Sequence, residues 1–411
     1  MTETFTFSGR LRTISILLIV LGVAAVVGGY LYPKFAGLSA VEHTAWMKRY
    51  WGNLLLNNFY LVAMGLGATF FIAIQYVSNA GWSAGLKRIP EAMGSVLPVS
   101  FIFMLIIFYF GGHTLYHWTH DTVDPIILGK SGYLNEAFFF IRMAVFFGLW
   151  IIFWLLFRRS SVQEDFEGGM DHYRKTRRNS ILFIIVFALS ITFSGFDWLM
   201  SLDPHWFSTM FGVYTFAGVF VHSVAVMVLI LILLKDNGYL KNINNDHYQD
   251  LGKYLFAFST FWMYIFFFQF MLIWYANMPE ETAYWRDRIG GLEYMTDGTV
   301  RYFYTNTLYL FIANFVINWF VPFLVLMSRN AKRKRPVLLG ISVVLIVGYW
   351  LDLFLMIMPS LNRSFSIGFL ELSMFLGFVG LFIFIVMTTL SKAPLQPQKH
   401  PFLEESEHHH I

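Results

Sequence analysis

Two aspartates lie in long apolar stretches, and each precedes a proline by seven residues. They are Asp197 before Pro204 and Asp352 before Pro359. A carboxyl group is costly in an apolar medium, so it is usually paired, hydrated or functional. Because carboxyl groups accept and release protons, both aspartates are proton-transfer candidates. The alternative is a neutral or paired group that only holds helix ends together.

Arg142 is a basic residue inside a further apolar stretch. A guanidinium group pairs with a carboxylate through two parallel hydrogen bonds, and Asp197 or Glu136 is the expected partner. We include Arg142 among the proton-transfer candidates. A purely structural ion pair is the alternative.

Histidines cluster where another apolar stretch ends, in the pattern His113-x3-His117-x2-His120-Asp121. On a helix, the spacing of His113 and His117 places both on one side. Three interpretations stand: ligation of a metal or haem, binding and deprotonation of a quinol, or no role at all. For the quinol interpretation, the candidates are His113, His117, Asp121 and Asp197.

Two more ionisable residues are predicted near the middle of apolar stretches, His222 and Glu371. Together with the two aspartates they would form a proton relay across the bilayer. A histidine at this depth is also compatible with a simple hydrogen-bonded group between helices. Haem ligation would need two histidines at similar depth, and His222 lies deeper than His113, so no metal site is predicted.

Composition excludes several classes of protein. The 411 residues are 57% hydrophobic and only 13% charged, and the chain has no cysteine. A soluble fold could not hide so much apolar surface, and a disordered chain or a disulfide scaffold is equally excluded. Without cysteine, the chain cannot ligate an iron–sulfur cluster through thiolates or attach a c-type haem. The slight positive charge does not indicate nucleic-acid binding.

Ten apolar stretches are long enough to cross a membrane as helices. They are residues 13–32, 52–77, 93–113, 135–157, 180–200, 207–234, 254–277, 304–327, 337–358 and 366–390. With the N-terminus in the cytoplasm, twenty of the 29 Lys and Arg residues fall on the inner side and eight on the outer side. This bias predicts that both termini are cytoplasmic.

An internal repeat is indicated by the shared Asp-x6-Pro spacing. It predicts two like-oriented four-helix bundles, spans two to five (51–205) and spans six to nine (206–360), flanked by spans one and ten. Arg142 aligns with Ala313, so the two units differ chemically. The transmembrane domain is expected to cover 1–390, and the proline-rich tail 391–411 to be extended and cytoplasmic.

The most specific stretch of the sequence is 193–214, FSGFDWLMSLDPHWFSTMFGVY. It resembles the polytopic membrane subunits of bacterial alternative complex III, a quinol:cytochrome c oxidoreductase. The chain as a whole is most similar to the smaller subunit, ActF, which is related to ActC and to the NrfD/PsrC family. ActC-type chains continue as Pro-Gly-Trp-His, whereas this chain has Pro204-His205-Trp206-Phe207.

The resemblance implies a multi-pass protein of the bacterial inner membrane that holds no redox centre itself. The partners that it implies, in addition to lipids, are an ActC-like subunit, multi-haem cytochrome c subunits and an iron–sulfur subunit. A terminal cytochrome oxidase is a further candidate partner. No cofactor is expected to be bound by this chain itself; a quinol, expected to be menaquinol, is the candidate ligand, and haem c and iron–sulfur clusters are expected in the partner subunits. The shifted histidine favours a role in proton transfer and assembly, so the subunit is not expected to be catalytic alone.

Two other functions remain open from the sequence. A secondary transporter would place a binding site at mid-membrane between repeats. A purely structural scaffold would need none of the ionisable residues within the spans.

Overall fold

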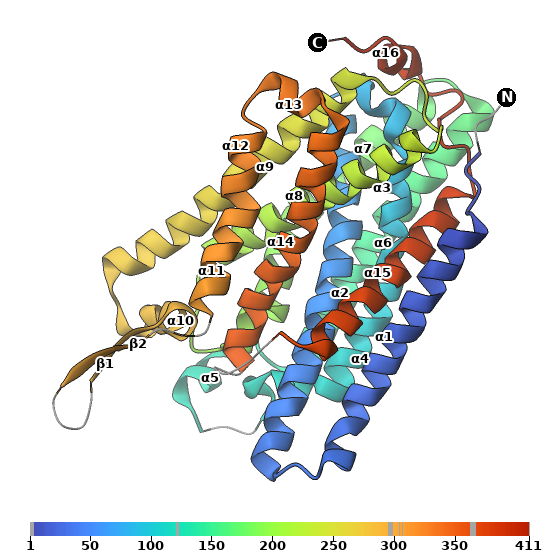
Figure 1. The fold of residues 1–411 in the computed structure, drawn as a ribbon. Coiled ribbons are helices and arrows are strands. Elements are labelled where there is room, and N and C mark those ends of the chain that lie inside the picture. Colours follow the sequence, from blue (N-terminus) through green and yellow to red (C-terminus); the bar gives the residue numbers. More distant parts are fainter. Residues whose placement is uncertain are drawn as a thin grey trace.

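The computed structural model describes residues 4–120, 123–294, 299–303, 305, 307–361 and 367–410, and they are almost entirely helical. Within this part of the chain, ten helical stretches are long and apolar enough to cross a membrane, which confirms the predicted number. The chain is therefore a multi-pass membrane protein. The long helices run side by side, as Figure 1 shows.

Each of the ten stretches is either one long helix or a run of consecutive shorter helices. They are α1 (Gly9–Ala36), α2 (Ala40–Val77), α3 with η2 and α4 (Arg88–Leu115), α6 (Glu136–Glu167), α7 with η4 (Asp171–Leu202), α8 (Met210–Asp236), α9 (Asn245–Ala276), α11 with η5 and α12 (Leu308–Val325), α14 (Arg335–Leu361) and α15 (Phe369–Leu390).

Shorter elements lie within and between these stretches. They are η1 (Gly81–Leu86), α3 (Arg88–Met93), η2 (Gly94–Val96), α4 (Leu97–Leu115), η3 (His117–Thr119), α5 (Pro125–Lys130), η4 (Met200–Leu202), α10 (Pro279–Ile289), β1 (Gly291–Tyr294), β2 (Val300–Phe303), α11 (Leu308–Phe315), the π-helical turn η5 (Val316–Phe320), α12 (Val321–Val325), α13 (Arg329–Arg333) and α16 (Leu403–Glu407). Strands β1 and β2 form an antiparallel hairpin in which Gly291 pairs with Phe303.

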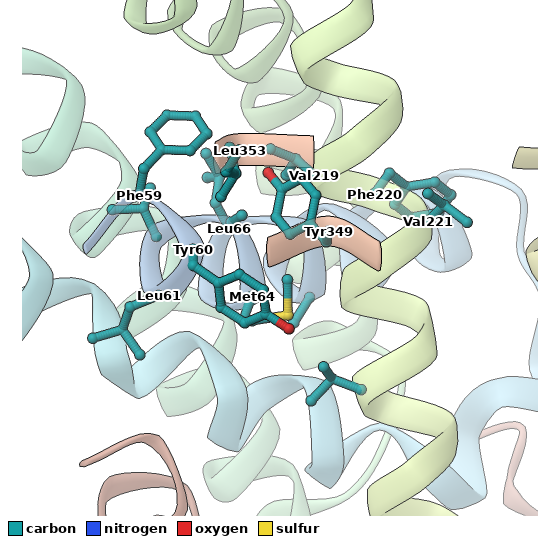
Figure 2. Close-up of a cluster of buried hydrophobic side chains, with 14 of the residues drawn as sticks. Phe59, Tyr60, Leu61, Met64, Leu66, Val219, Phe220, Val221, Tyr349 and Leu353 are labelled. Carbon is teal, nitrogen blue, oxygen red and sulfur yellow. The ribbon is translucent and has the colours of Figure 1, made fainter. Parts of the chain in front are cut away.

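Helices α2, α8 and α14 form the centre of the molecule. About nine tenths of the apolar part of α2 and of α8 is buried, against about one sixth for α1. Figure 2 shows side chains of these three helices together, with Tyr349 beside α2 and α8. A side chain at Gly67 would collide with Ser223, so glycine is what allows α2 and α8 to approach this closely.

Each central helix packs within one of two groups of helices. The first helix group contains α2, α4, α6 and α7, which contact one another in sequence. The second helix group contains α8, α9, α11 with η5 and α12, and α14. α1 and α15 form a separate pair, packed on each other and on α2. The pair approaches so closely that a Cβ on Gly377 would lie 2.4 Å from the Cα of Gly22.

Several helices extend beyond the predicted spans. α6 continues to Glu167 instead of ending near 157, and α7 begins at Asp171 instead of near 180. Gly168, with φ of +70°, ends α6, so the predicted connection 158–179 shrinks to three residues. α2 begins at Ala40, where Ser39 and Glu42 form a capping box. Hydropathy predicts the part of a helix that can lie in lipid, but it does not predict the polar extension of the same helix.

Both termini lie at the same end of the molecule, which we call the terminal end (Figure 1). There Thr4 forms a β-bridge with Pro394, and the tail packs on this chain's own helix ends. The expected extended conformation is wrong for residues 403–407, which form α16. α10 and the hairpin lie at the opposite end.

Candidate functional site

Asp197 lies one residue before the end of α7, and its side chain is fully buried. As expected, Arg142 is its partner: Nε lies 2.7 Å from Oδ2 and Nη2 lies 3.1 Å from Oδ1. The guanidinium carbon also lies 3.9 Å from the ring centre of Tyr133, and Nη1 donates to the Tyr133 carbonyl at 2.9 Å. Asp197 is therefore held as one half of a bidentate, buried ion pair.

Asp352 lies nine residues before the end of α14 and is also buried. Its donors come from the three other components of the second helix group. Asn314 Nδ2 donates to Oδ1 at 2.9 Å, Trp262 Nε1 donates to Oδ2 at 3.2 Å, and the Tyr214 hydroxyl donates to Oδ1. All three donors are neutral. The two aspartates thus share a spacing to proline but not an electrostatic environment.

A chain of polar side chains runs inward from Asp352. Asn318 Nδ2 donates to Asn314 Oδ1 at 2.6 Å and to the Gly348 carbonyl at 3.0 Å, which determines the orientation of its amide. Asn318 Oδ1 then lies 3.0 Å from His222 Nε2. The π-helical turn η5 carries Asn318, and such turns are frequent at functional sites.

His222 lies near the middle of α8, as expected, and is fully buried. Its Nδ1 lies 2.6 Å from the Gly218 carbonyl oxygen, so both ring nitrogens face oxygen acceptors. A neutral imidazole has only one N–H, whereas an imidazolium has two. This arrangement can accommodate an additional proton on the ring, while Asp352 at the other end of the polar chain faces donors only.

A second site is an open cavity of about 750 Å³ lined by the first part of α2, the end of α4, the segment after η4 and the end of α14. Histidines from four segments line it together with Lys48 and Asp203. They are His43, His113, His117, His120 and His205. Outside the spans, Asp124 lies beside it: a hydrogen bond with His205 Nε2 at 2.6 Å holds the pKa of the Asp124 carboxyl below its ordinary value.

The structure changes the predicted geometry of the histidine cluster. α4 ends at Leu115 and Tyr116 is extended, so His113 and His117 are not on one helix. They nevertheless line the same cavity. Asp197 is not part of that lining, and Asp121 lies outside the described residues. Glu136, the alternative partner for Arg142, instead lies 3.5 Å from His113.

Glu371 is not at mid-helix, contrary to expectation. It lies in the first turn of α15, where its carboxylate caps the backbone N–H of Gly368 at 2.9 Å. Arg49 donates to it through two nitrogens at 2.6 and 2.7 Å, and Asn53 Nδ2 donates at 2.9 Å. This environment is that of a helix-capping ion pair.

A buried ion network at the terminal end is not predictable from the sequence. Lys87 Nζ lies 2.5 Å from Glu164, while Arg88 contacts both Glu91 and Asp165. Burial lowers the pKa of Lys87, and the neighbouring Glu164 opposes this shift. Hydropathy assigns Glu164 and Asp165 to the loop after the fourth predicted span, although they lie on α6. The sequence therefore gives no indication that they contact Lys87 and Arg88.

Three features among the described residues are therefore candidates for proton transfer or ligand binding. They are the ion-paired Asp197, the site of Asp352 with its neutral donors and polar chain, and the histidine cavity. Among the described residues, no group of three His, Asp or Glu side chains could hold a metal ion. No protein-family model matches the sequence, and no curated protein matches it.

Proposed function

We propose that this chain is an integral membrane subunit of a respiratory quinol:cytochrome c oxidoreductase of the alternative complex III type. In this proposal it transfers protons that accompany quinol oxidation, and it helps to assemble the complex in the bacterial inner membrane. The resemblance of residues 193–214 supports the family, and the environment of Asp352 carries the proposal of proton transfer.

Asp352 is suited to proton exchange because, within the described part of the chain, no cation is bonded to its carboxylate. Its hydrogen bonds come from Tyr214, Trp262 and Asn314, all of them neutral. The polar chain through Asn318 links it to His222, whose two acceptors can hold a second ring proton. Ionisable side chains within a membrane bundle are functional candidates by default, and in this proposal Asp352 and His222 are the groups that hold protons. Asp197, in contrast, is neutralised by Arg142.

The histidine cavity supports the proposed quinol interaction. Its volume of about 750 Å³ lies within the range of small-molecule sites, roughly 300–1,000 Å³. Neutral imidazoles accept protons from a hydroxyl group, and His113 and His117 would be the acceptors for a quinol headgroup.

The orientation follows from charge placement in this proposal. The terminal end would be cytoplasmic, and the histidine cavity and α10 would face the outer side. The two helix groups would correspond to the proposed repeats, and an ActC-like subunit, cytochrome c subunits and an iron–sulfur subunit would be the partners.

Purification of the tagged chain from its native membrane tests this proposal. We expect c-type haem, iron–sulfur signals and quinol:cytochrome c activity to co-purify with it. A chain that purifies free of redox centres from active membranes would contradict the proposal.

A further inference from the structure

A small cavity lies beside Asp352, between the second helix group and α10. Its volume is about 20 Å³, which is sufficient for one water molecule. The side chains in its lining that carry polar atoms are Tyr214, Gln269, Tyr284, Trp285, Arg288, Asn314 and Asp352, and all of them are buried. The cavity therefore brings a carboxylate, a guanidinium and an amide around a space of molecular size.

Gln269 indicates that this space binds a ligand. Its side chain lies on α9 and is only 3% exposed. The amide nitrogen Nε2 is buried and makes no hydrogen bond with any described residue. Leaving a buried donor unpaired costs about 1–3 kcal/mol, so a partner in the cavity is strongly favoured.

Arg288 and Trp285, both on α10, also line the cavity. Nε donates to the Leu355 carbonyl at 3.2 Å, and Nη2 donates to Met356 O at 3.1 Å and to Ser360 Oγ at 2.9 Å. Nη1 donates to the Tyr284 carbonyl at 2.9 Å, and the guanidinium carbon lies 3.3 Å from the centre of the Tyr284 ring. Trp285 Nε1 is buried and makes no hydrogen bond with any described residue, so it is the second unpaired donor. Burial lowers the pKa of Arg288, which lies outside the membrane-spanning segments.

The donors and the acceptor together define the chemical class of the ligand. A metal cation would meet Asp352 favourably but would face the N–H groups of Gln269 and Trp285. An anion would meet those donors favourably but would face the carboxylate. A neutral molecule that both donates and accepts satisfies all three groups, and the volume restricts it to one small molecule.

We propose that this cavity binds one ordered water molecule. The water accepts hydrogen bonds from the two unpaired donors of the lining, Gln269 Nε2 and Trp285 Nε1, and donates one to the Asp352 carboxylate. α10 thereby supplies the second helix group with a neutral donor, coupled to Asp352 through water, where the first helix group has the direct Arg142–Asp197 pair. A role of this water in receiving the proton of Asp352 rests on the proposed function. The binding of the water does not depend on that function.

The test is a density map of the purified protein at a resolution that shows other buried waters. We expect a peak about 2.7–3.2 Å from both Gln269 Nε2 and the Asp352 carboxylate. The peak should remain when sodium is replaced by an organic cation and chloride by gluconate. It should disappear in Gln269→Met, which keeps the volume and removes the donor.

Gln75→Met is the matched control. Gln75 is a buried glutamine with its own unpaired amide atom, but it lines a different cavity at the terminal end. The peak beside Asp352 should persist in this variant. The proposal is wrong if the unmodified protein shows no peak there, or if the peak depends on sodium or chloride. Because neither readout needs quinol or partner subunits, failure of this proposal is distinguishable from failure of the proposed function.

Discussion

Asp197 and Asp352 show how far the same residue at the same spacing can differ. Asp197 accepts two hydrogen bonds from a guanidinium, whereas Asp352 accepts three from neutral groups. A bidentate ion pair holds its charges in place, and a site of neutral donors leaves the proton free to exchange. In the proposed function, Asp197 therefore contributes to stability and Asp352 to proton transfer.

The Arg142–Asp197 pair makes a stability prediction at this scale. Arg142→Met or Asp197→Leu alone should lower the free energy of unfolding by about 3–5 kcal/mol, because each leaves one buried charge unpaired. The double variant should lose much less than the sum of the two. Unfolding in detergent measures all four proteins, and purely additive losses would show that the pair is not coupled.

At the residue scale, sequence reasoning succeeds where one charge has few possible partners. Arg142 has few acids near its depth, so Asp197 could be predicted. The donors to Asp352 could not, because Tyr214 and Trp262 come from helices 138 and 90 positions away and neutral side chains carry no pairing signal. Arg288 escapes prediction because it lies in a connection rather than in a span.

At the scale of the elements, the close packing of α1 on α15 depends on the glycines at the point where the two helices cross. Gly377→Ala should destabilise the protein by about 1–3 kcal/mol, because the new Cβ would overlap the backbone of Gly22. Gly28→Ala on α1 is the control, since no atom lies within 4 Å of its added Cβ. Thermal unfolding in detergent compares them, and equal effects would contradict the close packing.

Docking of the tail depends on pH through His400. In the docked tail Phe402 N donates to His400 Nδ1 at 3.2 Å, and burial lowers the pKa of the ring to about 2. A released tail binds a proton below its ordinary pKa of about 6.5, whereas the docked tail does not. Acid therefore favours release, by about 1.4 kcal/mol at pH 5.5.

Hydrogen exchange of residues 394–407 as a function of pH measures this release. Protection should fall between about pH 6.5 and 5 in the unmodified protein. His400→Leu should reduce the dependence, leaving the part due to His247, which is also buried where it contacts Ser406 of the tail. His408→Ala, at an exposed position, should keep the full dependence. An unchanged pH dependence in His400→Leu would assign the effect to another group.

Element prediction from hydropathy is correct for the number of spans and poor for their ends. Apolar length determines which residues can lie in lipid, so the ten spans follow from composition. Capping at Ser39 and Gly168 decides where α2 begins and α6 ends, and both sites lie in polar sequence. The position of the tail depends on contacts with Trp82, His247 and Asp250, which are distant in sequence.

For the whole molecule, the two helix groups meet through α2 and α8, and each contains one of the two aspartates, Asp197 on α7 and Asp352 on α14. The predicted repeat, the orientation in the membrane and the partners stay predictions. What the structure adds is an asymmetry between the groups. The first helix group contains the bidentate Arg142–Asp197 ion pair, and the second helix group contains the polar chain from Asp352 to His222.

The most direct test is quinol-driven proton release by the reconstituted complex carrying Asp352→Asn. We predict that proton release falls by about 100-fold or more, while haem and iron–sulfur content stay unchanged, because the variant lacks the exchangeable group. Asp171→Asn, at an almost fully exposed acid, is the control and should behave like the unmodified complex. Proton release that is unchanged in a fully assembled Asp352→Asn complex would contradict the assignment of Asp352 to proton transfer.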